Sequence, residues 1–185
     1  MLKSDEKRAL LQIARAAIRS TLGKGEPETP EETGTGLDEK AGVFVTLRLQ
    51  GKLRGCVGLI ETDRPLKVTV GEIARKAAFE DPRFSPLTVS ELEDAEFEIS
   101  ILSQVQPLLS LDDLDVGLHG IIVESGLLRG LLLPQVPLEF GWTRQQFVSA
   151  VLQKAGLPQS AATDPGTRFY SFVTERATEN EGEFA

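Results

Sequence analysis

A chain of 185 residues, 41% hydrophobic and 26% charged, has an ordinary globular composition and needs no metal or disulfide to fold. One cysteine excludes an internal disulfide, and one cysteine with one histidine excludes a closed zinc site of Cys and His ligands. The net charge of −8 argues against nucleic acid as a partner. No apolar run approaches the ~18 residues of a membrane span, and the first residues lack a signal-peptide pattern. We therefore expect a cytoplasmic protein without membrane contact.

The N-terminal segment predicts one helix followed by a loop. Apolar residues recur at helical spacing over residues 4–22, where Ser4 can cap the start and Gly23 ends the helix. The segment 23–36 combines prolines, glutamates and glycines, so it cannot bury a core and predicts an exposed acidic loop.

A hairpin and a second helix follow. Hydrophobic alternation over 41–49 predicts a half-buried strand, and Gln50-Gly51 predicts a tight turn into a partner strand over 52–60. Pro65 opens a helix that ends near Asp81, because the residue before a proline avoids helical geometry.

The second half of the chain predicts more strands and one helix. Residues 95–103 alternate as a strand, and residues 118–124 and 127–133 form a hairpin about Ser125-Gly126. Thr143 begins a capping box for a helix that ends at Gly156. Residues 167–175 predict a last strand, and residues 176–185 an acidic, frayed tail.

These elements predict an α+β fold, with a largely antiparallel sheet and flanking helices, because hairpins and helices do not alternate regularly. We expect a single domain over 1–175, followed by the tail 176–185.

The stretch Leu53–Gly58 (LRGCVG) holds the only cysteine. On a strand, Arg54 and Cys56 point to the same face, which places a fixed positive charge beside a thiol, as in reactive cysteine sites. Gly55 and Gly58 leave room for a small ligand or for a neighbouring element. The alternative is a cysteine that packs as a small hydrophobic side chain.

Two further residues are candidates for acid–base chemistry. His119 is the only histidine, so Cys56 and His119 are the only Cys–His pair that this chain can form. Glu98 lies on the polar face of its strand. The acidic cluster Asp112, Asp113 and Asp115 lacks the spacing of a calcium loop, so we predict capping and solubility there, no metal site and no bound cofactor.

Taken together, these motifs resemble the AMMECR family, and the resemblance spans nearly the whole chain. The matching segments are 51–58 (GKLRGCVG), 78–84 (AFEDPRF), 98–102 (EISIL), 117–121 (GLHGI), 132–136 (LLPQV) and 154–158 (KAGLP). Leu152 departs from relatives that often carry a second cysteine there, and Leu127-Leu128 replaces a more polar turn. If exposed, that leucine pair is a candidate contact patch.

The resemblance implies an α+β fold with a larger and a smaller subdomain, a cleft between them, and Leu53–Gly58 as the hallmark. It implies no settled activity. Relatives in bacteria and archaea are often encoded beside, or fused to, a Memo-like protein and a radical S-adenosylmethionine protein, which makes these the expected partners.

Two functions follow. In the first, the protein is an enzyme or enzyme component in which Cys56 reacts, His119 serves as base, Glu98 orients it, and Arg54, Gly55 and Gly58 bind the ligand. In the second, it is a non-catalytic module that binds a protein partner, and Cys56 is structural.

Overall fold

The predicted α+β class is confirmed by the computed structural model, which describes residues 1–25 and 35–179. The described residues divide into two units: unit 1 contains those up to residue 101 together with residues 175–179, and unit 2 contains residues 102–174. Most of the loop predicted over 23–36 lies outside the described residues. Within the described ranges, no helix has the length and apolar character required to cross a membrane.

Unit 1 is built on a four-stranded sheet in the order β2-β1-β3-β8. The strands are β1 (Val43–Leu49), β2 (Lys52–Leu59), β3 (Ala95–Leu102) and β8 (Thr174–Thr178), and β1 pairs antiparallel with both β2 and β3. Gln50 and Gly51, with φ of 51° and 73°, form the predicted tight turn between β1 and β2.

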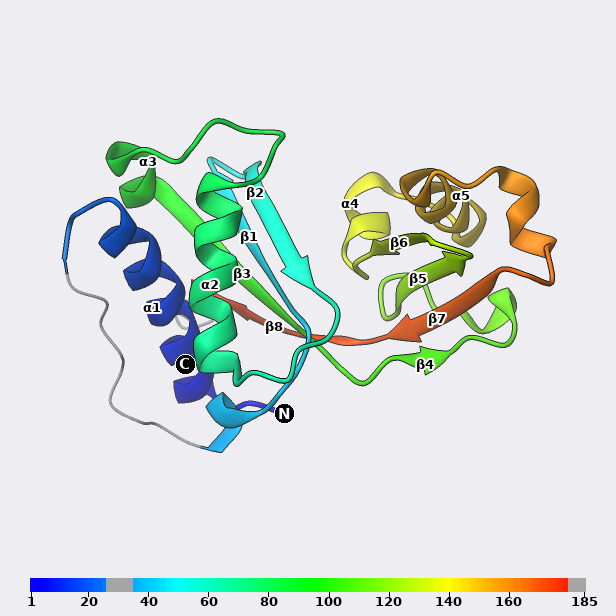
Figure 1. Ribbon diagram of the computed structural model, residues 1–185, viewed down its shortest axis with the longest axis horizontal. Coiled ribbons are helices and arrows are strands. Elements are labelled where there is room, and N and C mark those ends of the chain that lie inside the picture. Colours follow the sequence, from blue (N-terminus) through cyan, green and yellow to red (C-terminus); the bar gives the residue numbers. More distant parts are fainter. Residues whose placement is uncertain (26–34, 180–185) are drawn as a thin grey trace. The chain divides into compact units, whose positions relative to one another are not determined.

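Two long helices, α1 (Ser4–Thr21) and α2 (Leu66–Phe79), pack together on one face of this sheet (Figure 1). The two helices cover alternate residues of β1 in one hydrophobic core: Val43, Val45 and Leu47. The short elements η1 (Thr35–Asp38) and α3 (Val89–Asp94) complete the unit. The predicted Ser4 cap is wrong: the cap position is Lys3, whose backbone N–H donates to the Glu6 carboxylate at 2.8 Å, so the acidic first turn satisfies the helix start.

Unit 2 has its own four-stranded sheet in the order β4-β7-β5-β6. Its strands are β4 (Gln106–Pro107), β5 (Gly120–Ser125), β6 (Leu128–Leu132) and β7 (Arg168–Phe172). Helix α5 (Arg144–Ala155) packs on β5 and β6, and the short helices α4 (Val136–Phe140), η2 (Leu111–Asp113) and η3 (Gln159–Thr163) lie in the connections.

Local signals set the ends of the elements in unit 2. The Thr143 capping box is confirmed, and Gly156 ends α5 in the left-handed conformation with φ of 74°. The hairpin turn is displaced by one residue from the prediction: Ser125 still pairs with Leu128, so the turn consists of Gly126 and Leu127.

The end of the chain differs most from the prediction. The single strand expected over 167–175 is two strands, β7 in one sheet and β8 in the other, with Val173 between them. Residues 176–178, expected in a frayed tail, belong to β8, where Ala177 is only 1% exposed. Beyond the strand, Glu179 accepts hydrogen bonds from Arg15 at 2.8 Å and from the backbone N–H of Phe97 at 3.2 Å. The partner strand β3 lies far away in the sequence, so no local pattern marks this pairing.

Candidate functional site

Cys56 lies in the middle of β2, directly opposite Thr46 of β1. The Thr46 hydroxyl donates a hydrogen bond to the cysteine sulfur at 3.4 Å. Cys56 is free and half-buried, whereas Thr46 is buried. Partial exposure leaves that sulfur open to reagents.

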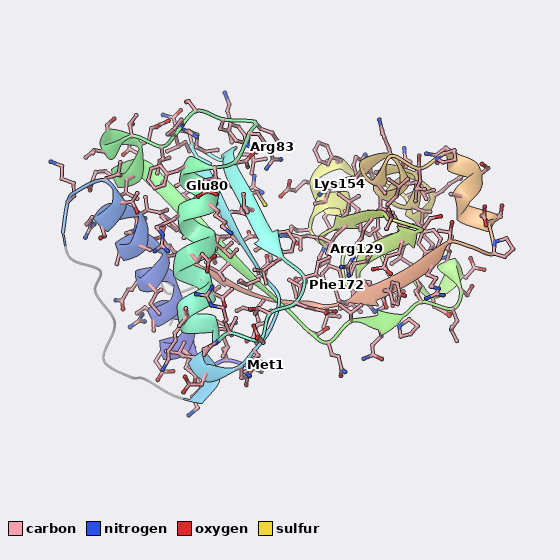
Figure 2. The ribbon with its side chains drawn as sticks, in the orientation of Figure 1. Met1, Glu80, Arg83, Arg129, Lys154 and Phe172 are labelled. Atoms are coloured by element: carbon pink, nitrogen blue, oxygen red, sulfur yellow. The ribbon has the colours of Figure 1, made fainter. Side chains whose placement is uncertain are left out.

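The backbone of Cys56 is held by a loop that follows α2. Its N–H donates to the Asp81 carboxylate at 2.9 Å, and its carbonyl oxygen accepts from the Arg83 guanidinium at 3.0 Å. Arg83 also donates to both oxygens of Asp81, at 2.9 and 2.6 Å. Figure 2 shows Arg83 next to β2, just beyond the end of α2.

The charges of this pair are strongly coupled. The Arg83 hydrogen bonds, reinforced by the Cys56 and Arg83 backbone N–H groups, lower the pKa of Asp81 to about 2 against the opposing effect of burial. In return, the Asp81 carboxylate raises the pKa of Arg83. Asp81 is buried, while about half of the Arg83 side chain is exposed. The guanidinium therefore remains accessible beside the cysteine.

Arg54 lies at an irregularity of the β1–β2 pairing, between Leu53 opposite Arg48 and Gly55 opposite Leu47, so the regular alternation that was expected to place it on the Cys56 face is broken. Its side chain is paired with Glu91 of α3. Its Nε and Nη2 donate to the two Glu91 oxygens at 2.8 and 3.1 Å, and its guanidinium lies 5.8 Å from the centre of the Phe84 ring. Hydrogen bonds from Arg54, and then from Thr88, lower the pKa of Glu91 to about 2. The charge expected beside the thiol is thus already balanced by a carboxylate.

The two glycines of the stretch are packed against neighbouring elements. A Cβ on Gly55 would collide with the carbonyl oxygen of Ala77, near the end of α2, and a Cβ on Gly58 would collide with the Phe44 ring. Of the two readings of these glycines, the observed contacts match room for a neighbouring element.

Glu98 lies on the same sheet face as Cys56, with Thr46 between them, because Thr46 pairs with Cys56 on β2 and with Glu98 on β3. Two strand spacings separate Cys56 from Glu98 by roughly 10 Å, too far for a direct hydrogen bond. Instead, Glu98 lies 3.9 Å from Arg176 of β8 and lines a pocket of about 300 Å³ with Arg48 and Arg176. Among the predicted site residues, Cys56 and Glu98 therefore share one face of the unit 1 sheet.

His119 belongs to unit 2, immediately before β5. Its Nδ1 accepts the backbone N–H of Asp115 at 3.1 Å. In a neutral imidazole one nitrogen accepts and the other carries the proton, so Nε2 carries the proton here. This tautomer donates from Nε2, whereas a base for a thiol requires a free lone pair there. The Cys56–His119 pair remains a prediction.

Sequence reasoning did not assign Thr46, Asp81, Arg83 and Glu91 to the site. Signals for three of them were present: Asp81 and Arg83 flank a proline at a helix end, and Thr88 and Glu91 form a capping box.

In the acidic cluster, Asp112 pairs with Arg144 at 3.4 Å. Across residues 1–25 and 35–179, no three His, Cys, Asp or Glu side chains converge as metal ligands.

The chain is similar in sequence and in structure to known proteins. The AMMECR1 family model matches residues 11–177. A protein of Methanothermobacter thermautotrophicus is 43% identical in an alignment of 181 positions that covers 94% of this chain and 94% of its own. Protein NEQ441 of Nanoarchaeum equitans is 41% identical over 88% of this chain and 94% of its own. The crystal structure of the uncharacterized protein PH0010 from Pyrococcus horikoshii is similar with a TM-score of 0.88 and 36% identity, over 95% of this chain and 92% of that one.

Proposed function

This chain belongs to the AMMECR1 family, and from that premise we propose that it acts as an enzyme, or as a component of one, through the thiol of Cys56. The observation that carries the proposal is the hydrogen bond from the Thr46 hydroxyl to the sulfur of a half-buried cysteine. A cysteine retained only for packing needs no donor on its sulfur, because a thiol behaves there as a small hydrophobic group.

In this proposal the surrounding residues have separate roles. Asp81 and Arg83 fix the backbone of Cys56, and the exposed part of Arg83 offers hydrogen-bond donors to an anionic group of the ligand. Arg54, held by Glu91, is a positioning residue. Glu98 contacts a distant part of the ligand, and His119 is the candidate base if its ring adopts the other tautomer.

The experiment is alkylation of Cys56 by iodoacetamide at a single pH, compared between the folded protein and the protein in denaturant. Cys56 is the only thiol, so the rate reports this site alone. We expect the folded protein to react at least as fast as the denatured chain, and Thr46→Val to slow the folded reaction about threefold, since it removes the donor on the sulfur. A folded thiol that reacts only after unfolding would contradict the proposal.

The candidate partners are inferred from the family resemblance alone. We propose a Memo-like protein or a radical S-adenosylmethionine protein as the physiological partner. The test is co-purification of the chain with each candidate protein, taken from the same organism as the chain. A comparison of the parent chain with Arg83→Ala shows whether binding involves the Cys56 site.

The second candidate function is a non-catalytic interaction module. It is favoured by one set of observations: Gly55, Gly58 and Arg54 are all engaged by neighbours within unit 1. In that case Cys56→Ser lowers the free energy of unfolding but leaves partner binding unchanged. Loss of a partner-dependent activity in a Cys56→Ser variant that folds normally would exclude it.

A further inference from the structure

Unit 2 contains a pocket of about 670 Å³ that lies outside the Cys56 site. Its walls come from the segment after β4 and from the connection between η3 and β7. Pro107, Leu109 and Tyr170 supply apolar surface, and Asp112, Asp164 and Arg168 supply charged groups. Binding sites for small molecules have volumes of ~300–1,000 Å³ and mostly apolar walls with a few polar groups, so this pocket has the size and lining of one.

Leu109 marks the pocket as a surface suited to an apolar ligand. Its side chain is 94% exposed, and it lines the pocket together with Leu108, Leu111 and Phe169. A single exposed leucine is common on protein surfaces, but one that lines a concave apolar surface gains burial when a ligand enters.

The backbone excludes an added strand as the occupant. β4 is an edge strand of the sheet. The backbone N–H of Leu108 points toward β7 and donates to the carbonyl of Phe169 at 2.9 Å. Because the direction of the backbone groups alternates along a strand, those of residue 107 point away from the sheet, toward the open edge. Pro107 has no N–H to donate at this outward position, which blocks strand addition there. The pocket therefore suits a small molecule better than an extended peptide.

The charges of the lining select the sign of the ligand. The lining contains two carboxylates, Asp112 and Asp164, and one guanidinium, Arg168, and the whole chain carries a net charge of −8. Asp112 has an ion pair with Arg144 at 3.4 Å, but its side chain is 95% exposed, so that pair is weak and screened. A positively charged group beside Tyr170 also gains a cation–π contact.

We propose that this pocket of unit 2 binds a small organic cation with a flat apolar body. The site is independent of Cys56 and of any reaction there. Its ligand places the apolar body against Leu109 and Tyr170 and its charged group toward Asp164 and Asp112.

The test uses two probes of matched shape and opposite charge, tryptamine and indole-3-propionate, with the full-length protein. Saturation-transfer NMR detects binding, and titration of the protein amide signals gives the affinity and locates the site. We expect tryptamine to bind in the millimolar range with shifts in residues 107–112 and 162–170, and indole-3-propionate to bind at least ~5-fold more weakly, given the opposite sign of its charge.

Three variants test the site. Leu109→Ser should weaken tryptamine binding about tenfold, because part of a leucine side chain no longer covers the ring. Asp164→Asn should weaken it about threefold, while its side-chain oxygen can still accept the Gly166 N–H at 2.7 Å. Leu127→Ser is the matched control, because Leu127 is fully exposed in the same unit but does not line the pocket.

Equal affinity for the two probes would overturn the charge assignment and with it the proposal. The same holds if tryptamine causes no saturation transfer at millimolar concentration, or if Leu109→Ser binds it as well as Leu127→Ser does.

Discussion

The Asp81 carboxylate accepts the backbone N–H of Cys56 at 2.9 Å, although 25 positions separate the two residues in the sequence. Arg83 closes the arrangement by donating to the Cys56 carbonyl and to Asp81. A peptide unit on each side of the cysteine is thereby fixed by one ion pair, of which only the carboxylate is buried. The geometry of the LRGCVG stretch consequently depends on the loop that follows α2.

Asp81→Asn should destabilise the protein by about 2 kcal/mol at pH 7, because the pKa of Asp81 is lowered from 3.8 to about 2 in the folded state. A lowered carboxyl pKa stabilises the fold above the unfolded value, and that contribution is lost as the pH falls from about 4 to about 2. Urea unfolding of both proteins at pH 7, 4 and 3 measures the effect. The difference between them should shrink at the acidic end; a difference independent of pH would show that the charge of Asp81 is not its source.

Glu91→Gln should destabilise unit 1 by roughly 2 kcal/mol, because it leaves the mostly buried guanidinium of Arg54 without its counter-charge. The low pKa of Glu91 has the same sign of pH dependence as that of Asp81, so the loss should also diminish in acid. Urea unfolding at pH 7 and pH 3 measures it. Glu93→Gln, on an exposed position of the same helix, is the control and should change stability little.

Gly55→Ala should cost about 1–3 kcal/mol, because the added Cβ meets the backbone carbonyl of Ala77 and α2 must shift away from β2. Gly71→Ala is the matched comparison in α2. A Cβ at Gly71 finds Ala17 and Ile13 at an ordinary 3.5 Å, and alanine is a better helix former by about 1 kcal/mol. Thermal unfolding should therefore give a lower melting temperature than that of the parent chain for Gly55→Ala and a higher one for Gly71→Ala. Equal stability of the two variants would argue against close packing at Gly55.

Arg15→Lys should destabilise unit 1 by about 2 kcal/mol. The guanidinium donates to the carbonyls of Leu92 and Ala95, both at 2.8 Å, as well as to Glu179, and a lysine cannot reach three partners with a planar fork. Hydrogen exchange of the β8 amides reports whether the loss is local to that strand. Arg8→Lys, on an exposed position of α1, is the control.

The sequence alone was sufficient for the elements that carry local signals. Alternating apolar residues predicted β1, Gln50-Gly51 predicted its turn, and the Thr143 capping box predicted the start of α5. Each depends on residues within about four positions of one another, and the side-chain period and turn chemistry act over that range. The same reasoning located Cys56 on a strand, but the register shift at Arg54 breaks the alternation that was expected to place the two side chains on one face.

Only the tertiary structure decided which groups surround them. Thr46, Asp81 and Glu91 come from three other segments: β1, the loop after α2, and α3. Their hydrogen bonds to the LRGCVG stretch require these segments to lie beside β2. The division of residues 168–178 between two sheets has the same origin, since β8 pairs with a strand more than 70 positions earlier. Sequence patterns encode which face a residue presents, but pairing between distant segments is decided by the free energy of the whole core.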